Sequence, residues 1–208
     1  MNFLEKSTRP DISCAVHQCA QFTADPKIQH GKVVKHIGRY LAGSAQQGLI
    51  YKPDITKSLE CFVDSDFSGN WNKEDADSDM DTARSRTGYV IRYAGCPIVW
   101  GSKLQTHIAL SSTEAEYIAI STAMREVIPL MALLKEMSEK QFITHNNQAD
   151  IHCQIFEDNS GAIEIAQTTK YRPRTKHINT QYHHFRYYVD TGQLRLQYIP
   201  SKINLLIC

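Results

Sequence analysis

Glu60-Cys61-Phe62-Val63-Asp64-Ser65-Asp66-Phe67 is an apolar run that ends in two carboxylates, and we expect it to form a β-strand. Because side chains alternate between the two faces of a strand, Asp64 and Asp66 point the same way, beside Phe62. An aspartate at the end of a buried strand loses hydration and needs a partner, usually a cation. Aspartates also end strands in ordinary turns, so this pair alone leaves a metal site and a turn as alternatives.

Length and composition indicate a folded chain with a sizeable core. The chain has 208 residues, of which 42% are hydrophobic, enough for one full domain plus an appendage. The formal net charge is +1, from 23 basic and 22 acidic residues, so any basic surface for nucleic acid must be local. The six cysteines are scattered singly, which makes a zinc site unexpected and favours free thiols in a reducing compartment.

The terminal and apolar segments predict an intracellular chain. The N-terminus lacks the apolar core of a signal peptide, and no apolar run approaches the roughly 20 residues of a membrane span. We therefore expect no membrane partner.

The spacing of apolar residues predicts helices first and then a sheet. Two amphipathic helices are expected over 10–22 and 25–42, the second opened by Asp25-Pro26 and ended near Gly43. Together they cannot form a stable core and need a partner. The further expected elements are strands over 48–51, 60–67, 87–93, 96–102, 151–156 and 193–199, and helices over 111–137, after 159 and over 177–189.

Two further carboxylates follow this pattern of elements. Stepping back four residues from Ile120 places Glu116 on the apolar stripe of the long helix, where a solvated glutamate is unexpected. Asp158 follows a strand, and a helix N-cap remains an alternative role for it. If that strand lies parallel beside the first, Asp64 and Asp158 meet at one end and the helix brings Glu116 among them. Clustered carboxylates repel unless hard cations neutralise them, and oxygen ligands suit magnesium or manganese.

Such a cluster is typical of phosphodiester hydrolysis, where two ions about 4 Å apart activate water and stabilise the leaving oxygen. The histidines 177, 183 and 184 of the last predicted helix lack a cysteine or carboxylate to complete a zinc set. Packing or phosphate contacts are the expected roles for them.

Eight ordered motifs resemble the copia-type LTR retrotransposon Pol polyprotein, from the C-terminal tail of the reverse transcriptase through the RNase H domain. The motifs are Thr8-Arg9-Pro10-Asp11-Ile12-Ser13, Val63-Asp64-Ser65-Asp66, Ser85-Arg86-Thr87-Gly88-Tyr89, Val99-Trp100-Gly101-Ser102-Lys103, Leu110-Ser111-Ser112-Thr113-Glu114-Ala115-Glu116-Tyr117, Glu157-Asp158-Asn159, Lys176-His177-Ile178 and Tyr198-Ile199-Pro200.

The resemblance implies an α/β fold, an RNase H-like mixed five-stranded sheet flanked by helices and preceded by a short helical segment. Residues 1–50 would be a helical remnant of the reverse transcriptase C-terminal region, and 57–208 an RNase H-like domain lacking its last helix. The family has a fourth aspartate after the final strand, whereas here Asn204 is followed by apolar residues.

The implied function is a ribonuclease H-type endonuclease that cleaves the RNA strand of RNA–DNA hybrids with two Mg²⁺ or Mn²⁺ ions. Asp64, Glu116 and Asp158 match the family's first three metal-binding carboxylates, and Asp66 is a candidate further ligand. Ser112, Thr113 and Asn159 match positions that would contact the hybrid backbone.

The expected partners are an RNA–DNA hybrid and, in an intact polyprotein, the body of the reverse transcriptase. The expected location is the cytoplasm, in a virus-like particle, or the nucleus. Because the fourth carboxylate is absent, the alternative is an inactive retrotransposon remnant that at most binds nucleic acid.

Overall fold

The computed structural model describes residues 1–69, 71, 73, 80–142, 151–168 and 180–201. In chain order, its elements are α1 (Asn2–Ser7), the 3-10 helix η1 (Pro10–Ile12), α2 (Ser13–Ala20), α3 (Ile28–Gly43), β1 (Leu59–Asp66), η2 (Met80–Ala83), β2 (Arg86–Tyr93), β3 (Cys96–Leu104), α4 (Ser112–Glu139), β4 (Cys153–Glu157), α5 (Ser160–Gln167), η4 (Thr180–His183), α6 (Arg186–Asp190) and β5 (Leu194–Tyr198).

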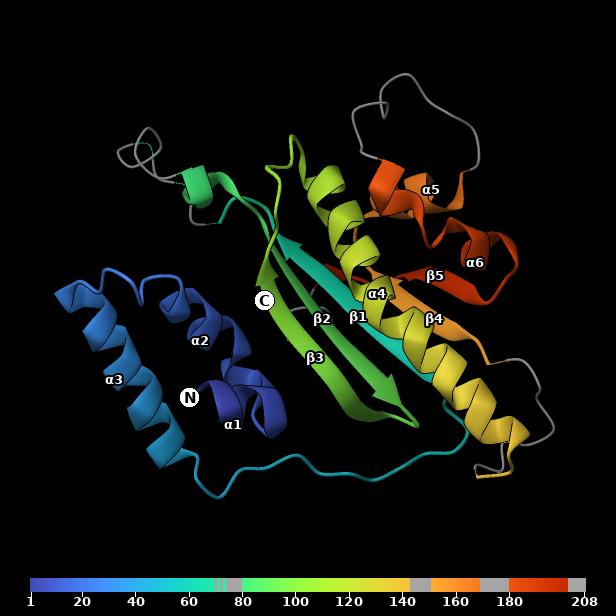
Figure 1. Ribbon diagram of the computed structural model, residues 1–208, viewed down its shortest axis with the longest axis horizontal. Coiled ribbons are helices and arrows are strands. Elements are labelled where there is room, and N and C mark those ends of the chain that lie inside the picture. Colours follow the sequence, from blue (N-terminus) through green and yellow to red (C-terminus); the bar gives the residue numbers. More distant parts are fainter. Residues whose placement is uncertain (70, 72, 74–79, 143–150, 169–179, 202–208) are drawn as a thin grey trace.

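A mixed five-stranded sheet is the centre of the molecule (Figure 1). The strand order is β3-β2-β1-β4-β5; β1 pairs antiparallel with β2, and β2 with β3. β4 pairs parallel with β1, and β5 parallel with β4. The predicted sheet flanked by helices, with the fourth strand parallel beside the first, is therefore confirmed, and the fold is RNase H-like.

The central strand β1 separates a core face from a second face. Leu59, Cys61 and Val63 are fully buried and belong to the main core with the apolar side of α4. Burying a side chain of this kind stabilises the fold by about 1.5–3 kcal/mol. The alternate residues Phe62 and Asp64 are half-buried on the opposite face. The strict alternation of burial along β1 therefore fixes which way each carboxylate points.

The start of α4 is fixed by reciprocal hydrogen bonds. The Ser111 hydroxyl accepts the backbone N–H of Glu114 (3.2 Å), and Glu114 Oε2 accepts the backbone N–H of Leu110 (2.8 Å). The first bond satisfies a donor that a helix N-terminus leaves without a partner, and the second fixes the residue before the N-cap. The helix then continues through Pro129 to Glu139.

By length and apolar composition, α4 is the one helix among the described residues that could cross a membrane. The sequence had predicted no apolar run long enough for a membrane span. However, 56% of its most apolar window is buried, and the helix packs along β1 and β2. Its role as the core helix of the sheet accounts for the apolar composition.

The N-terminal helices lie beside β3 (Figure 1). The indole N–H of Trp100 in β3 donates to the backbone oxygen of Glu5 in α1 (2.7 Å). Ile12, Val16 and Ile37 form a second, small apolar cluster between these helices. This segment is helical, as predicted, and its assignment to a reverse transcriptase remains a prediction.

The predicted start of the second helix is wrong. α3 begins at Ile28, not at Asp25-Pro26, because the side chain of His30 stacks on Phe22 with ring centroids 4.0 Å apart and accepts the backbone N–H of Lys27 (3.1 Å). This local bond makes Lys27 the N-cap residue.

Two other predicted elements differ. Residues 48–51 form no strand, since Ile50 and Tyr51 remain 87% and 57% exposed and pair with no neighbouring strand. The predicted helix over 177–189 begins outside the described residues. From Thr180 onward the segment forms two short helices, η4 and α6. The helix is interrupted between them, where the side chain of Phe185 packs into the core.

Candidate functional site

The register between the two central parallel strands places two aspartates side by side. Phe62 of β1 pairs with Phe156 of β4, and their rings stack with centroids 4.6 Å apart. Two residues farther on the same face come Asp64 and Asp158. Since parallel strands run to the same sheet edge, both carboxylates lie at one end of the sheet.

Glu116 completes a group of three carboxylates. It lies near the start of α4, where the helix packs against β1. One oxygen from each of Asp64, Glu116 and Asp158 lies within 4.8 Å of the other two. The structure therefore brings together the three carboxylates that the sequence singled out.

Burial and negative charge disfavour ionisation of Glu116, which is 6% exposed. Loss of hydration, and then the charges of Glu157, Asp64 and Asp158, raise its pKa to about 10, against a smaller opposing effect of the Ser65 backbone N–H. Its Oε2 atom is buried without a hydrogen-bond partner in the described part of the chain. A buried oxygen of this kind is stabilised by a cation.

Glu157 is a further carboxylate beside these three, and it was not among the predicted site residues. It is fully buried, and burial raises its pKa to about 8, opposed by the Asn159 N–H and reinforced by Asp158 and Asp64. The Asn159 N–H donates to Glu157 Oε1 (3.1 Å). The sequence pattern could have indicated this, because alternation along β4 puts Glu157 on the buried face with Cys153 and Ile155.

The donor set fits a hard divalent cation. The cluster offers oxygen ligands only, and neutralising their mutual repulsion would favour metal binding. The buried Oε2 atoms of Glu116 and Glu157, both without partners among the residues described, are consistent with the same conclusion.

The comparisons with known proteins agree with this geometry. The chain is 35% identical over 197 residues to the retrovirus-related Pol polyprotein from transposon TNT 1-94 of Nicotiana tabacum, which covers 95% of this chain. It is 35% identical over 198 residues, again 95% of the chain, to that from transposon RE1 of Arabidopsis thaliana. Along almost its whole length, this chain is therefore similar to transposon Pol polyproteins. No family model matches it.

This chain spans only 13% and 12% of the lengths of these two relatives. Among solved structures, LC11-RNase H1, isolated from compost by a metagenomic approach, aligns with a TM-score of 0.45 at 15% identity, covering 72% of this chain and 92% of that one. The strand order and register, rather than this score, identify β1 to β5 as a ribonuclease H-type domain.

Asp66 does not join the group formed by Asp64, Glu116 and Asp158. It shares the face of Asp64, as predicted, but its carboxylate occupies the space that a Cβ at Gly69 would need. The chain turns there, with Ser68 in the left-handed region at φ 50°. The turn therefore directs Asp66 toward the following loop.

The other predicted site residues lie together where two helices begin. Asn159, not Asp158, is the N-cap of α5, because its Oδ1 accepts the Ala162 N–H (3.0 Å). The Thr113 hydroxyl donates to the same Oδ1 (3.4 Å), and Ser112 is exposed beside it. The N-cap alternative for Asp158 is thus wrong, and Thr113 and Asn159 lie together next to the cluster.

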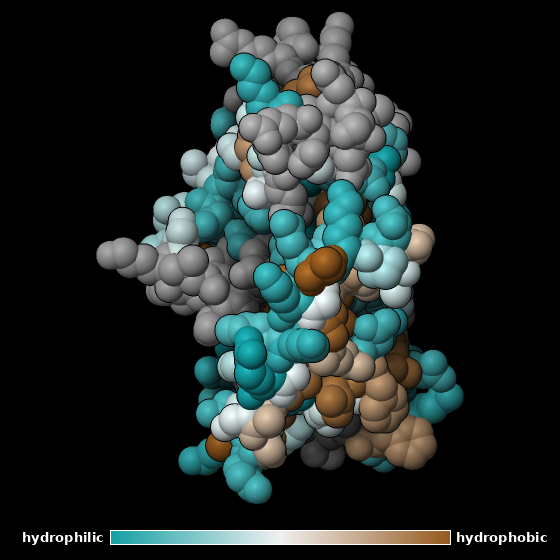
Figure 2. All heavy atoms as spheres, turned by 90° about the vertical axis from the view of Figure 1, so that its left-hand side faces the viewer, coloured by the Kyte–Doolittle hydropathy of each residue, from teal (hydrophilic) through white to brown (hydrophobic). Residues whose placement is uncertain are grey.

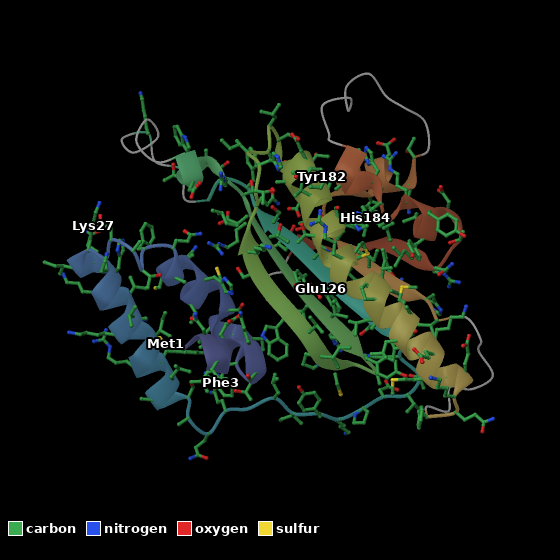
Figure 3. All side chains as sticks on the ribbon, in the orientation of Figure 1. Met1, Phe3, Lys27, Glu126, Tyr182 and His184 are labelled. Atoms are coloured by element: carbon green, nitrogen blue, oxygen red, sulfur yellow. The ribbon has the colours of Figure 1, made fainter. Side chains whose placement is uncertain are left out.

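Two histidines near α4 contact tyrosine hydroxyl groups. His183 Nδ1 lies 2.5 Å from the Tyr117 hydroxyl, and His107 Nδ1 lies 2.9 Å from the Tyr182 hydroxyl. Figure 3 shows Tyr182 and His184 beside the first half of α4. His177 lies outside the described residues. These contacts agree with the packing role predicted for His183.

Proposed function

We propose that this chain is a ribonuclease H-type endonuclease that cleaves the RNA strand of RNA–DNA hybrids with Mg²⁺ or Mn²⁺. The observation that carries the proposal is the group of Asp64, Glu116 and Asp158, whose oxygens lie within 4.8 Å of one another at the end of the central strands. The RNase H-like sheet and the similarity to transposon Pol polyproteins support the proposal.

The three carboxylates would hold the metal, and Glu157 adds negative charge from the buried side. A bound divalent ion would activate water and neutralise charge on the phosphate under attack. Asp64 and Asp158 come from adjacent strands whose register is fixed by the sheet, and Glu116 comes from a helix packed on that sheet. Rigid elements of this kind hold ligands without reorganisation during the reaction.

Thr113, Asn159 and Ser112 would contact the backbone of the bound hybrid. They lie at the N-termini of α4 and α5, where the helix dipole and the first N–H groups favour a phosphate. This surface borders the carboxylates, so a phosphate held there would place the next backbone segment near the cluster.

The wild-type chain is expected to cut the labelled RNA strand of an RNA–DNA hybrid in the presence of Mg²⁺ or Mn²⁺. EDTA should stop the reaction, and double-stranded DNA should remain intact. Gel electrophoresis of the labelled products measures this directly. Salt-dependent binding of the hybrid without cutting would contradict the enzyme proposal and favour the inactive remnant.

We also infer that the outer surface of the N-terminal helices binds the body of a reverse transcriptase, the partner that the resemblance of residues 1–50 to the C-terminal region of that enzyme implies. Phe3, Ile28 and Val33 are 80%, 84% and 46% exposed. Figure 2 shows hydrophobic side chains gathered in the lower half of this face, and Figure 3 shows Phe3 on α1. Large apolar side chains left this exposed are suited to burial in an interface.

The substitution Val33→Asp is expected to prevent co-purification with the polypeptide that precedes the matched region in the tobacco relative. A charge buried in an apolar interface has no compensating partner, so binding should weaken at least tenfold, or about 1.4 kcal/mol. Gln167→Asp adds the same charge to an exposed position of α5, away from the N-terminal helices, and serves as the control. Equal co-purification of the two variants would refute this docking surface.

A further inference from the structure

We propose that Gln105 is a positioning residue that holds the end of β1 and the start of α4 together, and thereby sets the separation of Asp64 and Glu116. The inference rests on the proposed function in one respect, namely that these carboxylates bind a metal ion. It goes beyond that function by assigning the geometry of the cluster to one uncharged side chain outside it.

Gln105 follows β3 and is 4% exposed. Its side-chain nitrogen Nε2 donates toward three oxygens that belong to three different elements. The acceptors are Ala115 O of α4 (2.9 Å), Thr87 Oγ1 of β2 (3.1 Å) and Ser65 Oγ of β1 (3.3 Å). Its backbone N–H donates to Ser85 O (2.8 Å), so the residue is fixed at both its main chain and its side chain.

The orientation of the amide follows from its partners. Ala115 O is a carbonyl oxygen and can only accept, so the nitrogen of the Gln105 amide must face it. The second N–H of the amide is shared between the hydroxyl oxygens of Thr87 and Ser65. Neither of the two other terminal groups of similar size, the carboxylate of glutamate and the methyl group of methionine, can make this set of bonds.

Two of the three acceptors adjoin the carboxylates of the cluster. Ser65 directly follows Asp64, and Ala115 directly precedes Glu116. The backbone N–H of Ser65 also hydrogen-bonds to the Glu116 carboxylate. Gln105, Ala115–Glu116 and Ser65 thus form a closed circuit of covalent and hydrogen bonds around the cluster. A change in the length of the Gln105 link would move α4 relative to β1.

The unsatisfied oxygen of Gln105 indicates that the residue is not there for stability alone. Its Oε1 is buried with no partner within the described ranges. Leaving such an oxygen unpaired destabilises the folded state. An apolar side chain of similar volume would avoid that cost, but it could not connect β1 with α4. Residues retained against a local cost are typical of functional sites.

The test is Mn²⁺ binding by the purified full-length chain, measured by electron paramagnetic resonance of the free ion. Gln105→Met should lower the Mn²⁺ affinity about 10- to 100-fold, the effect typical of a residue that orients metal ligands. Thr87→Val removes only the acceptor on β2, which contributes no carboxylate to the cluster, and should leave the affinity within about twofold. Gln105→Asn keeps the amide but shortens the link, and should weaken binding as well.

The outcomes separate this inference from the proposed function. If the wild-type chain binds no Mn²⁺, the proposed function fails and this inference fails with it. If the wild type binds Mn²⁺ and folded Gln105→Met and Gln105→Asn bind it equally well, only the role of Gln105 is overturned. An equal loss of affinity in Thr87→Val would also overturn it, because general loosening of the fold would then explain both. Circular dichroism and thermal unfolding in EDTA establish that each variant is folded.

Discussion

The substitution Asp64→Asn is expected to abolish metal-dependent cleavage of an RNA–DNA hybrid. Asparagine has nearly the same shape as aspartate but removes one negative ligand from a group whose oxygens lie within 4.8 Å of one another. The loss should be on the order of 10³-fold, comparable to the removal of one preorganised group that stabilises a transition state. Initial rates on a labelled hybrid at saturating Mg²⁺ measure it.

The matched control is Asp66→Asn, on the same strand and the same face. Asp66 lies two residues away and its carboxylate is directed toward Gly69, so this variant should retain most of the wild-type rate. Asp64→Asn should also be at least as stable as the wild type in EDTA, because one repelling charge is gone. Equal inactivation by the two substitutions would show that the metal site differs from the one described here.

The sheet and the positions of Asp64, Glu116 and Asp158 could be predicted, because they follow from the local, periodic spacing of apolar residues. Alternation along β1 fixes the face of Asp64, and helical spacing places Glu116 on the buried stripe of α4. Their meeting with Asp158 requires only that β4 lie parallel beside β1, which the register confirms. Elements whose burial follows a simple period are specified by the sequence pattern itself.

Other features depend on individual contacts that the spacing of apolar residues does not predict. The start of α3 depends on the hydrogen bond from Lys27 to His30. The N-cap of α5 depends on which of two adjacent polar residues, Asp158 or Asn159, turns back to the helix. Glu157 was missed because a glutamate at a buried strand position was treated as the end of the strand. The three acceptors of Gln105 come from three separate elements, so only the folded chain brings them together.

The substitution Glu116→Gln is expected to stabilise the metal-free protein at pH 8 while abolishing cleavage. Burial and the neighbouring carboxylates raise the pKa of Glu116 to about 10 and that of Glu157 to about 8. In the unfolded chain both titrate near 4.5. The folded state therefore binds more protons than the unfolded state between these values, and stability falls as the pH rises from about 4.5 through 8. Glutamine mimics the protonated form and removes the Glu116 contribution.

In EDTA, the wild-type Tm should therefore be lower at pH 8 than at pH 5, and Glu116→Gln should reduce that difference. A gain of about 1 kcal/mol or more at pH 8 corresponds to at least about 2–4 °C for a chain of this length. Mg²⁺ should raise the wild-type Tm at pH 8 by binding the folded state alone, and should have little effect on the variant, which lacks a ligand.

Glu114→Gln provides the control on the same helix. Glu114 is also buried, 8% exposed, but its carboxylate accepts the Leu110 N–H and is not part of the metal group. Its replacement should lower the Tm at both pH values by weakening the start of α4. Thermal unfolding at pH 5 and pH 8, with EDTA and with Mg²⁺, distinguishes the two glutamates. A Glu116→Gln variant no more stable than the wild type in EDTA at pH 8 would mean that repulsion within the cluster is already relieved without a metal ion.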